Sequence, residues 1–174
     1  MFPQKIRTQE ESDALIRELA WNDAFGCYSK AGFKKLIWPE IADRARWIIF
    51  FDVDGVHDIN KAHRDYATFD AMMKQVLSIL RLTDYVAGQL NSGDEFLVCL
   101  IEGDSLLIGD LRQTLDPEVI MQRLIAELKK QNLTAIFAIV PVISPDLDVN
   151  LEPAIHKMFL TKEARGAERR STTC

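Results

Sequence analysis

The stretch YVAGQLNSGDEFLVCLI, residues 85 to 101, predicts a β-hairpin. Its two halves, 85–90 and 96–101, are rich in residues that favour strands, and a polar, glycine-containing segment separates them. Two such segments joined by a polar turn are typical of antiparallel neighbours in a sheet. We therefore expect Asp94 and Glu95 at the tip of this hairpin, where acidic residues are also common for reasons of turn geometry alone.

A second apolar run, WIIFF at 47–51, predicts a central strand that is covered on both faces. It ends at Asp52, the first residue of the sequence DVDG. A hairpin beside this strand would bring Asp94 and Glu95 near Asp52, and three carboxylates at one place repel each other unless a cation lies among them. Because Mg²⁺ is commonly held by one or two carboxylates together with phosphate oxygens, the pattern favours metal-assisted phosphoryl or nucleotidyl transfer. An isolated Asp-x-Asp pair would instead be a solvated loop that caps the next helix.

The rest of the chain predicts helices before, between and after these strands. A capping box at Thr8 and Glu11 begins an N-terminal helix that ends near Trp21. A last strand is expected over 134–142 and a last helix over 152–164. Further helices are expected to begin near Phe33, Phe69 and Val119. The order of the elements indicates a layered α/β (α+β) domain whose sheet contains an antiparallel hairpin.

The composition suits a single soluble domain. The 174 residues are 48% hydrophobic and 27% charged, and the net charge of −5 argues against binding to the phosphate backbone of DNA. The longest apolar run, 135–143, is too short to cross a bilayer, no signal peptide precedes it, and the three cysteines lack metal or disulfide spacing. We therefore expect a cytoplasmic protein without membrane insertion. Its parts would be an N-terminal helix (1–22), one domain (23–166) and a frayed polar tail (167–174).

These motifs together resemble the GGDEF domain, which defines the diguanylate cyclase family. The signature itself reads SGDEF at 92–96, with a serine in place of the first glycine. The family's apolar strand that ends in Asp-x-Asp and is followed by Ile-Asn is similar to 51–60. The segments 23–33 and 155–162 resemble the family's early and late motifs more loosely, so the resemblance spans about 23–166.

The resemblance implies a ferredoxin-like fold of the nucleotidyl-cyclase palm type, with a central, mostly antiparallel sheet, flanking helices and a hairpin that carries the signature. It implies an enzyme that makes cyclic di-GMP from two GTP molecules with Mg²⁺ or Mn²⁺. The 3′-hydroxyl of one GTP would attack the α-phosphate of the other across a homodimer, and pyrophosphate would leave. Because the domain takes nearly all the length after residue 23, we expect no fused sensor. Self-association or a separate regulatory partner would then bring the half-sites together.

Residues that match the family's functional positions lie at the strand ends and on the helices around them. The resemblance gives the metal ligands as Asp52, the carbonyl of Val53 and Asp94. It gives the catalytic residues as Asp94 and Glu95. The expected substrate contacts are Asn60 and Asp70 on guanine, Lys162 on a phosphate, and Gly93, Gly55, Val56 and His57 at two turns that approach the ligand closely.

The two expected guanine contacts require an interruption between them. In one unbroken helix, Asn60 and Asp70 would be separated by about 15 Å, which is too far for both to hold one base. We therefore predict a break at 64–67. Without such a break, Asp70 would be an ordinary first-turn carboxylate that faces water.

Several positions depart from the family's pattern. His57 stands where a lysine is usual, and Gly166 stands where an arginine is usual, although Arg165 lies beside it. Arg81 and Asp84 match the family's RxxD product-inhibition motif in type, but a surface ion pair explains them equally well. These departures leave open a degenerate module that binds GTP or cyclic di-GMP without turnover.

A second alternative is a phosphatase of the haloacid-dehalogenase type, whose first motif is also an apolar strand followed by DxDG. Asp52 would then be the phosphorylated nucleophile and Asp54 the acid/base. That fold places its motifs on successive parallel strands. A hairpin over 84–101 would therefore exclude it.

Overall fold

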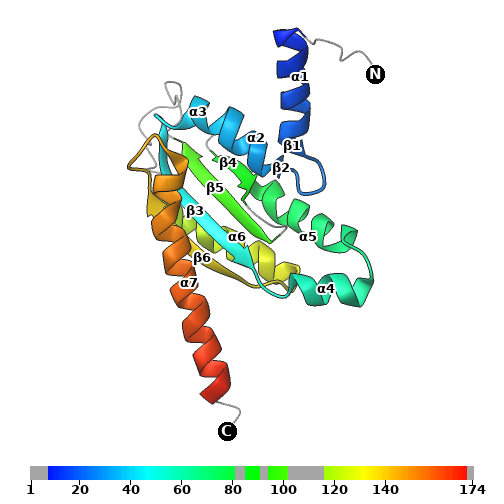
Figure 1. The fold of residues 1–174 in the computed structure, drawn as a ribbon. Helices are drawn as coiled ribbons and strands as arrows, with labels where there is room; N and C mark the ends of the chain where they lie inside the picture. Colours follow the sequence, from blue (N-terminus) through cyan, green and yellow to red (C-terminus); the bar gives the residue numbers. More distant parts are fainter. Residues whose placement is uncertain (1–7, 81–84, 91–93, 102–115, 172–174) are drawn as a thin grey trace, which may run out of the picture.

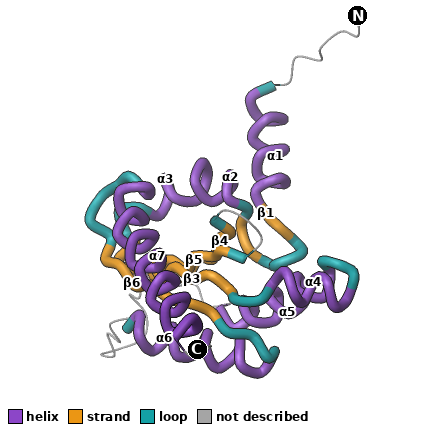
Figure 2. The backbone as a smooth tube through the Cα atoms, turned by 60° about the horizontal axis from the view of Figure 1, so that its bottom comes forward, coloured by secondary structure: helices purple, strands orange, loops and turns teal. Residues whose placement is uncertain are grey.

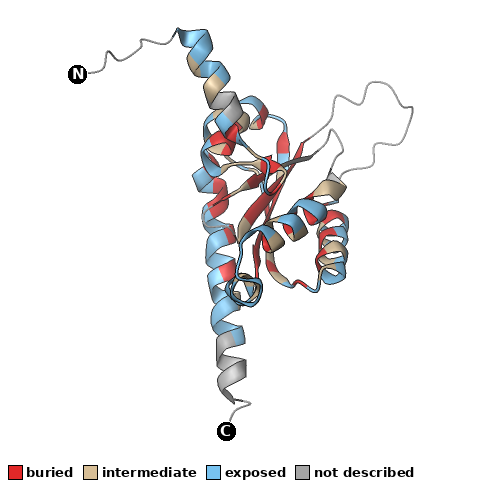
Figure 3. Cartoon of the chain, turned by 90° about the vertical axis from the view of Figure 1, so that its right-hand side faces the viewer, coloured by how far each residue is buried: buried red, intermediate tan, exposed pale blue. Residues whose placement is uncertain are grey.

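The chain folds into a six-stranded sheet that lies between two layers of helices (Figure 1). The computed structural model describes residues 8–80, 85–90, 94–101 and 116–171 of the 174-residue chain. Figure 3 shows the buried residues gathered in the sheet and on the helix faces turned towards it. Helix α1 (Gln9–Ala20) stands away from the sheet at one end of the molecule, and helix α7 (Leu147–Ser171) extends past it at the other.

The sheet contains the predicted hairpin and is mostly antiparallel, as expected. Its strands are β1 (Trp21–Asn22), β2 (Cys27–Tyr28), β3 (Ala45–Val53), β4 (Tyr85–Gln89), β5 (Glu95–Ile101) and β6 (Ala135–Pro141). They lie in the order β1-β2-β4-β5-β3-β6, and every neighbouring pair is antiparallel except β2 with β4. Because β4 and β5 form an antiparallel hairpin, the phosphatase alternative with its parallel sheet is excluded.

The helices cover both faces of this sheet. They are α2 (Lys30–Gly32), a π-helical turn at Phe33–Ile37, α3 (Trp38–Ile41), α4 (Val56–His63), α5 (Ala67–Leu77), α6 (Pro117–Lys130) and α7. The cluster of buried residues on one face joins α7 and α3 to the sheet, and the cluster on the other face joins α5 and α6 to it. Strands β3 to β6, with α4 and α5 after β3 and α6 after β5, give a ferredoxin-like order.

The central position of β3 explains its continuous apolar run. Ile48 and Phe50 pack in the cluster under α7, whereas Ile49 and Phe51 pack in the cluster under α5 and α6. Successive side chains of a strand point to opposite faces, so a strand that is covered on both sides needs apolar residues at every position. The prediction that 47–51 forms a central strand is confirmed.

The predicted helix break between Asn60 and Asp70 is present (Figure 2). Helix α4 ends before Arg64, which adopts the left-handed conformation with φ of 57°. The carboxylate Oδ1 of Asp65 accepts a 3.0 Å hydrogen bond from the backbone N–H of Thr68 and so caps the start of α5. The chain therefore turns between two short helices instead of continuing one long helix.

Helix α7 is longer than expected at both ends. The sequence predicts a helix over 152–164 and a frayed tail over 167–174, but α7 begins at Leu147 and its backbone stays helical through Ser171. The C-terminal extension follows from composition, because lysine, glutamate, alanine and arginine dominate 162–170 and are strong helix formers. Residues 172–174 lie outside the described part of the chain.

The loop that leads into α7 is organised by the side chain of Asn150, which is 1% exposed. Its Oδ1 accepts hydrogen bonds from the backbone N–H groups of Ile143 (2.8 Å) and Ser144 (3.0 Å). Its Nδ2 donates to the carbonyl oxygens of Ser144 (2.7 Å) and Asp146 (2.9 Å). This amide thus uses both its donors and both acceptor positions, which holds the loop and the first turn of α7 in one arrangement.

No helix in the described part of the chain combines the length and the apolar character that a membrane span requires. The buried thiols of Cys27 and Cys99 are free, in agreement with the absence of a disulfide pattern. Burial raises the pKa of Cys27 to about 12 and raises the pKa of Cys99 as well, so both thiols are protonated and unreactive at neutral pH.

Candidate functional site

The candidate site lies at the end of β3, where the acidic residues of β3 and β5 meet. In the antiparallel pairing of these strands, Asp52 lies directly opposite Glu95. The backbone N–H of Val53 donates a 2.9 Å hydrogen bond to the carbonyl oxygen of Asp94. Directly opposed residues share a face of the sheet, so Asp52 and Glu95 project to the same side. The sequence prediction that the hairpin brings its acidic tip to the end of β3 is confirmed.

Asp52 is the buried member of this group, and its partner comes from α7. The ammonium Nζ of Lys162 donates a 2.6 Å hydrogen bond to Oδ2 of Asp52, whose side chain is 8% exposed. Burial raises the pKa of Asp52, Lys162 opposes this effect, and the neighbouring carboxylates of Asp94 and Asp54 raise the pKa further. The hydrogen bond to Asp52 raises the pKa of Lys162. The site therefore holds a carboxylate whose charge is poorly solvated and is compensated by one cation.

Asp54, two residues further on, has partners of its own. Its Oδ2 accepts a 3.0 Å hydrogen bond from Oγ1 of Thr134 and a 3.2 Å hydrogen bond from Nη1 of Arg165. Its backbone N–H donates to the carbonyl oxygen of Thr134 at 2.8 Å. Thr134 and Arg165 were not predicted as site residues. Arg165 could have been predicted from the sequence, because it lies three residues after Lys162 and therefore on the same face of α7.

The turn after Asp54 leads directly into α4. Gly55 adopts φ of 75°, a conformation that favours glycine. Apart from Asp54 and Val56 beside it in the chain, no residue comes within 4 Å of the position that a Cβ would take there. Val56 and His57 form the first turn of α4, and the side chain of His57 is exposed. Gly55 therefore leaves open space directly before the first turn of α4, one residue after Asp54.

The two expected guanine contacts lie on the two helices that the break separates, and these helices pack against each other. The Oδ1 atom of Asn60 is buried and has no hydrogen-bond partner. Asp70 is half-buried, and its pKa is raised by burial and then by the charge of Asp65. A buried polar atom without a partner is rare in folded proteins and often marks a position that a ligand or water completes.

Metal ligands are not assembled as a complete set. Among the described residues, no group of three His, Cys, Asp or Glu side chains lies close enough together to hold an ion. Oxygen donors nevertheless suit Mg²⁺, which needs only one or two protein carboxylates when a nucleotide supplies phosphate oxygens. Asp52 and Asp94 fit this requirement, because their mutual repulsion would be relieved by a cation between them.

Three of the predicted site residues cannot be placed. Gly93 in the hairpin turn, and Arg81 and Asp84 in the RxxD pattern, lie outside the described residues. The product-inhibition motif therefore stays a prediction from sequence.

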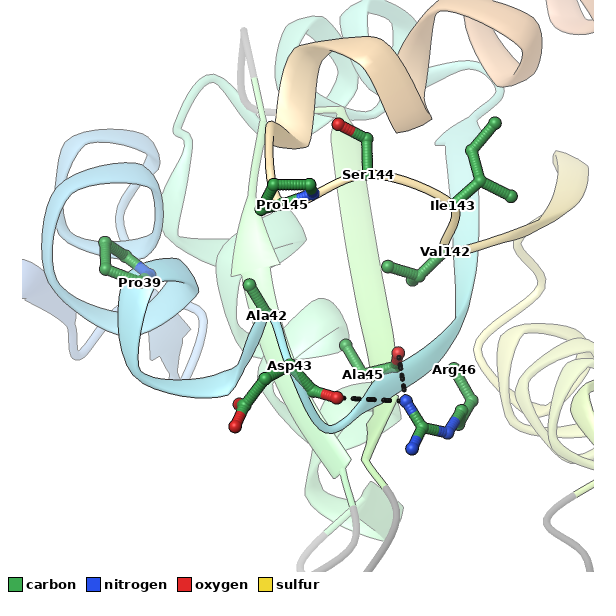
Figure 4. Close-up of a pocket in the computed structure, with 9 residues that line it drawn as sticks. All are labelled: Pro39, Ala42, Asp43, Ala45, Arg46, Val142, Ile143, Ser144 and Pro145. Carbon is green, nitrogen blue, oxygen red and sulfur yellow. Dashed lines mark hydrogen bonds between the residues drawn. The ribbon is translucent and has the colours of Figure 1, made fainter.

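A surface hollow of about 420 Å³ lies at the opposite end of β3 (Figure 4). The guanidinium of Arg46, one of the residues that line it, donates hydrogen bonds to the carbonyl oxygens of Asp43 (3.0 Å) and Ala45 (3.5 Å). The other residues that line it are Pro39, Ala42, Val142, Ile143, Ser144 and Pro145. Since β3 begins at Ala45 and the acidic group follows at its far end, the hollow shares no residue with the candidate site.

No protein-family model matches this sequence, and a search of curated proteins found no match. Solved structures do match its fold. The diguanylate cyclase SiaD from Pseudomonas aeruginosa, solved in complex with its activator SiaC, is 14% identical with a TM-score of 0.64, over 89% of this chain and 63% of the SiaD chain. A microbial GGDEF domain studied with cyclic di-GMP is 12% identical with a TM-score of 0.66, over 86% of this chain and 94% of that one. A sensory box/GGDEF family protein from Caulobacter crescentus is 18% identical with a TM-score of 0.62, over 83% of this chain and 99% of that one.

This chain therefore has the fold of GGDEF domains, as the sequence motifs predicted. It spans less than two thirds of the SiaD chain and nearly the whole of the other two. The fold agrees with the position of the SGDEF signature, whose described residues Asp94, Glu95 and Phe96 lie at the start of β5, beside the end of β3.

Proposed function

We propose that this protein is a diguanylate cyclase-like domain that binds GTP in the cytoplasm and joins two GTP molecules into cyclic di-GMP. The observation that carries the proposal is the meeting of Asp52 with Glu95 and Asp94 at the ends of two antiparallel strands, with Lys162 against them. The proposal is supported by the fold shared with GGDEF domains, among them a diguanylate cyclase and a domain studied with cyclic di-GMP.

In this proposal the residues divide into three groups. Asp52, Asp94 and the Val53 carbonyl would hold Mg²⁺ or Mn²⁺, which would neutralise the phosphates and polarise the α-phosphorus. Glu95 would assist the metal or the 3′-hydroxyl. The ligand itself would contact Lys162 and the turns at Gly55, Val56, His57 and Gly93 through its phosphates, and Asn60 and Asp70 through guanine.

The buried Oδ1 of Asn60 and the half-buried carboxylate of Asp70 support guanine as the base. A carboxylate can accept from the N1–H and N2–H₂ groups of guanine, whereas adenine has no equivalent pair of donors. The two GTP molecules would be held by two copies of the chain that face each other. A separate regulatory partner would control their encounter, and the SiaD structure, which contains an activator protein, offers a parallel.

A second candidate is a degenerate module that binds GTP or cyclic di-GMP without turnover. It is favoured by the pairing of Lys162 with Asp52 and of Arg165 with Asp54, which already compensates both carboxylates. The replacement of the usual lysine by His57 and of the usual arginine by Gly166 also removes positive charge that phosphates would need.

Incubation of the full chain with GTP and Mg²⁺, followed by mass spectrometry, separates these two candidates. We expect cyclic di-GMP, in an amount per protein molecule that rises with protein concentration because two copies must meet. Asp94→Ala should abolish the product, whereas the exposed carboxylate of Asp43, remote from the site, can be removed as a control. GTP binding without any product, even at high protein concentration, would favour the degenerate module.

A further inference from the structure

Asp54 joins three segments that are far apart in the chain. It lies at the turn between β3 and α4, Thr134 immediately precedes β6, and Arg165 lies in the C-terminal part of α7. All three meet at one atom, Oδ2 of Asp54. The second hydrogen bond between the Asp54 and Thr134 backbones fixes the threonine next to the carboxylate independently of its side chain.

The C-terminal part of α7 makes these polar contacts beyond the last buried residue of the helix. Met158 is the last buried residue among the described side chains of α7, and from Phe159 to Arg165 the side chains are exposed or half-buried. Lys162 and Arg165 lie one turn apart and reach Asp52 and Asp54, respectively. The pairs differ in burial, because the side chain of Asp52 is 8% exposed and that of Asp54 is 36% exposed. They also differ in that Oδ2 of Asp54 accepts a hydrogen bond from a neutral hydroxyl.

We propose that Thr134 and Arg165 are positioning residues, which act through Asp54 to hold the end of α7 so that the ammonium of Lys162 stays at the carboxylate of Asp52. Asp54 is then an anchor rather than a ligand, and the two carboxylates of the DVD sequence have separate tasks. An exposed ion pair alone contributes little, because two long side chains lose freedom when they pair. The hydrogen bond from the Thr134 hydroxyl already restricts the carboxylate of Asp54, so less side-chain freedom is lost when Arg165 pairs with it. The consequence for nucleotide binding rests on the proposed function.

The first test concerns the helix and needs no ligand. Thr134→Val removes the hydroxyl from an exposed position and keeps the shape of the side chain, and Thr134→Ser keeps the hydroxyl. Hydrogen–deuterium exchange of the full chain should show several-fold faster exchange over 159–165 in Thr134→Val, and wild-type exchange in Thr134→Ser. Lys34→Met removes the ion pair with Asp148 at the other end of α7 and should leave exchange over 159–165 unchanged.

The second test concerns the site. With GTP and Mg²⁺ as the probe, calorimetry should give about tenfold weaker binding for Thr134→Val and for Arg165→Ala, and wild-type binding for Thr134→Ser, since a displaced Lys162 loses a charge-assisted contact. If the chain forms cyclic di-GMP, KM should rise in these two variants with little change in kcat. An unfolding temperature close to that of the wild type would show that each variant weakens GTP binding without destabilising the whole fold.

The outcomes are distinguishable. Unchanged exchange over 159–165 in Thr134→Val would overturn the anchor, and so would failure of Thr134→Ser to restore it. Faster exchange with unchanged GTP binding would overturn the positioning of Lys162. If the wild-type chain binds neither GTP nor cyclic di-GMP, the proposed function fails, and the exchange experiment still decides the anchor.

Discussion

The ammonium of Lys162 lies 2.6 Å from the carboxylate of Asp52, although 110 positions separate the two residues in the chain. This contact brings the C-terminal helix to the end of the central strand and places one positive charge at the most buried carboxylate of the site. Any cation or phosphate that binds here must therefore share or replace an interaction that the protein already makes with itself.

Asp52→Asn should weaken Mg²⁺-dependent GTP binding by about tenfold or more, because the cation loses a charged ligand. The same variant should unfold at an equal or higher temperature than the wild type, since burial of the ionised carboxylate is unfavourable. Calorimetry and thermal unfolding measure the two effects, and Asp43→Asn, an exposed carboxylate remote from the site, is the control. A clear loss of stability in Asp52→Asn would show that the Lys162 pair outweighs desolvation.

The pH dependence of stability follows from the raised pKa of Asp52. The folded state binds this proton more tightly than the unfolded state, in which the pKa is near 3.8. The contribution of Asp52 to the free energy of unfolding therefore grows as the pH falls through its raised folded pKa towards 3.8, and it is lost as the pH rises again. Denaturant unfolding without metal or nucleotide should show wild type gaining stability relative to Asp52→Asn on acidification. A gain on raising the pH would contradict the prediction.

Base recognition can be tested at Asp70, because its half-buried carboxylate is expected to accept from guanine. Asp70→Asn should weaken GTP binding by roughly 10- to 100-fold, as expected for loss of a charge-assisted hydrogen bond. Inosine triphosphate lacks the N2 amino group, so its binding should fall less. The matched control is Asp65→Asn, which keeps an acceptor for the N–H of Thr68 at the start of α5. Equal losses for both nucleotides would remove Asp70 from the base contact.

The packing of β4 against the π-helical turn predicts a stability effect that is independent of function. A Cβ at Gly88 would lie 2.6 Å from Cδ2 of Phe33, whose ring is buried. Gly88→Ala should therefore lower the free energy of unfolding by about 1–3 kcal/mol through overpacking. Phe33→Leu in the same chain should recover part of this loss by making room, which a double-mutant cycle would measure. Additive losses would mean that the close approach is relieved elsewhere.

The sequence predicts the fold well where local pattern and packing agree. The apolar run at 47–51 predicts a strand that is covered on both faces, and the hairpin pattern around 91–94 predicts that the strands on either side of it pair antiparallel. The break after α4 is predictable for a different reason, because a length argument about Asn60 and Asp70 excludes the continuous helix. The first two inferences depend on short stretches of chain, whereas the third combines helix geometry with the guanine contacts that the family resemblance implies.

The sequence predicts the site less completely because its decisive contacts are long-range. Nothing local marks Thr134, a single threonine before a strand, as the partner of Asp54. The early start of α7 involves Asn150, whose side chain is hydrogen-bonded to the preceding loop at Ile143 and Ser144. The spacing of apolar residues gives no indication of these contacts. Of these contacts, that of Arg165 was predictable, because its spacing from Lys162 places both residues on one face of the helix.

The buried amide of Asn150 also fixes the point at which α7 begins. The helix is held rigidly there by four hydrogen bonds, whereas Lys162 lies about 18 Å further along the axis at 1.5 Å per residue. The direction in which α7 leaves Asn150 and crosses the sheet therefore helps to decide where the ammonium of Lys162 lies at the end of β3.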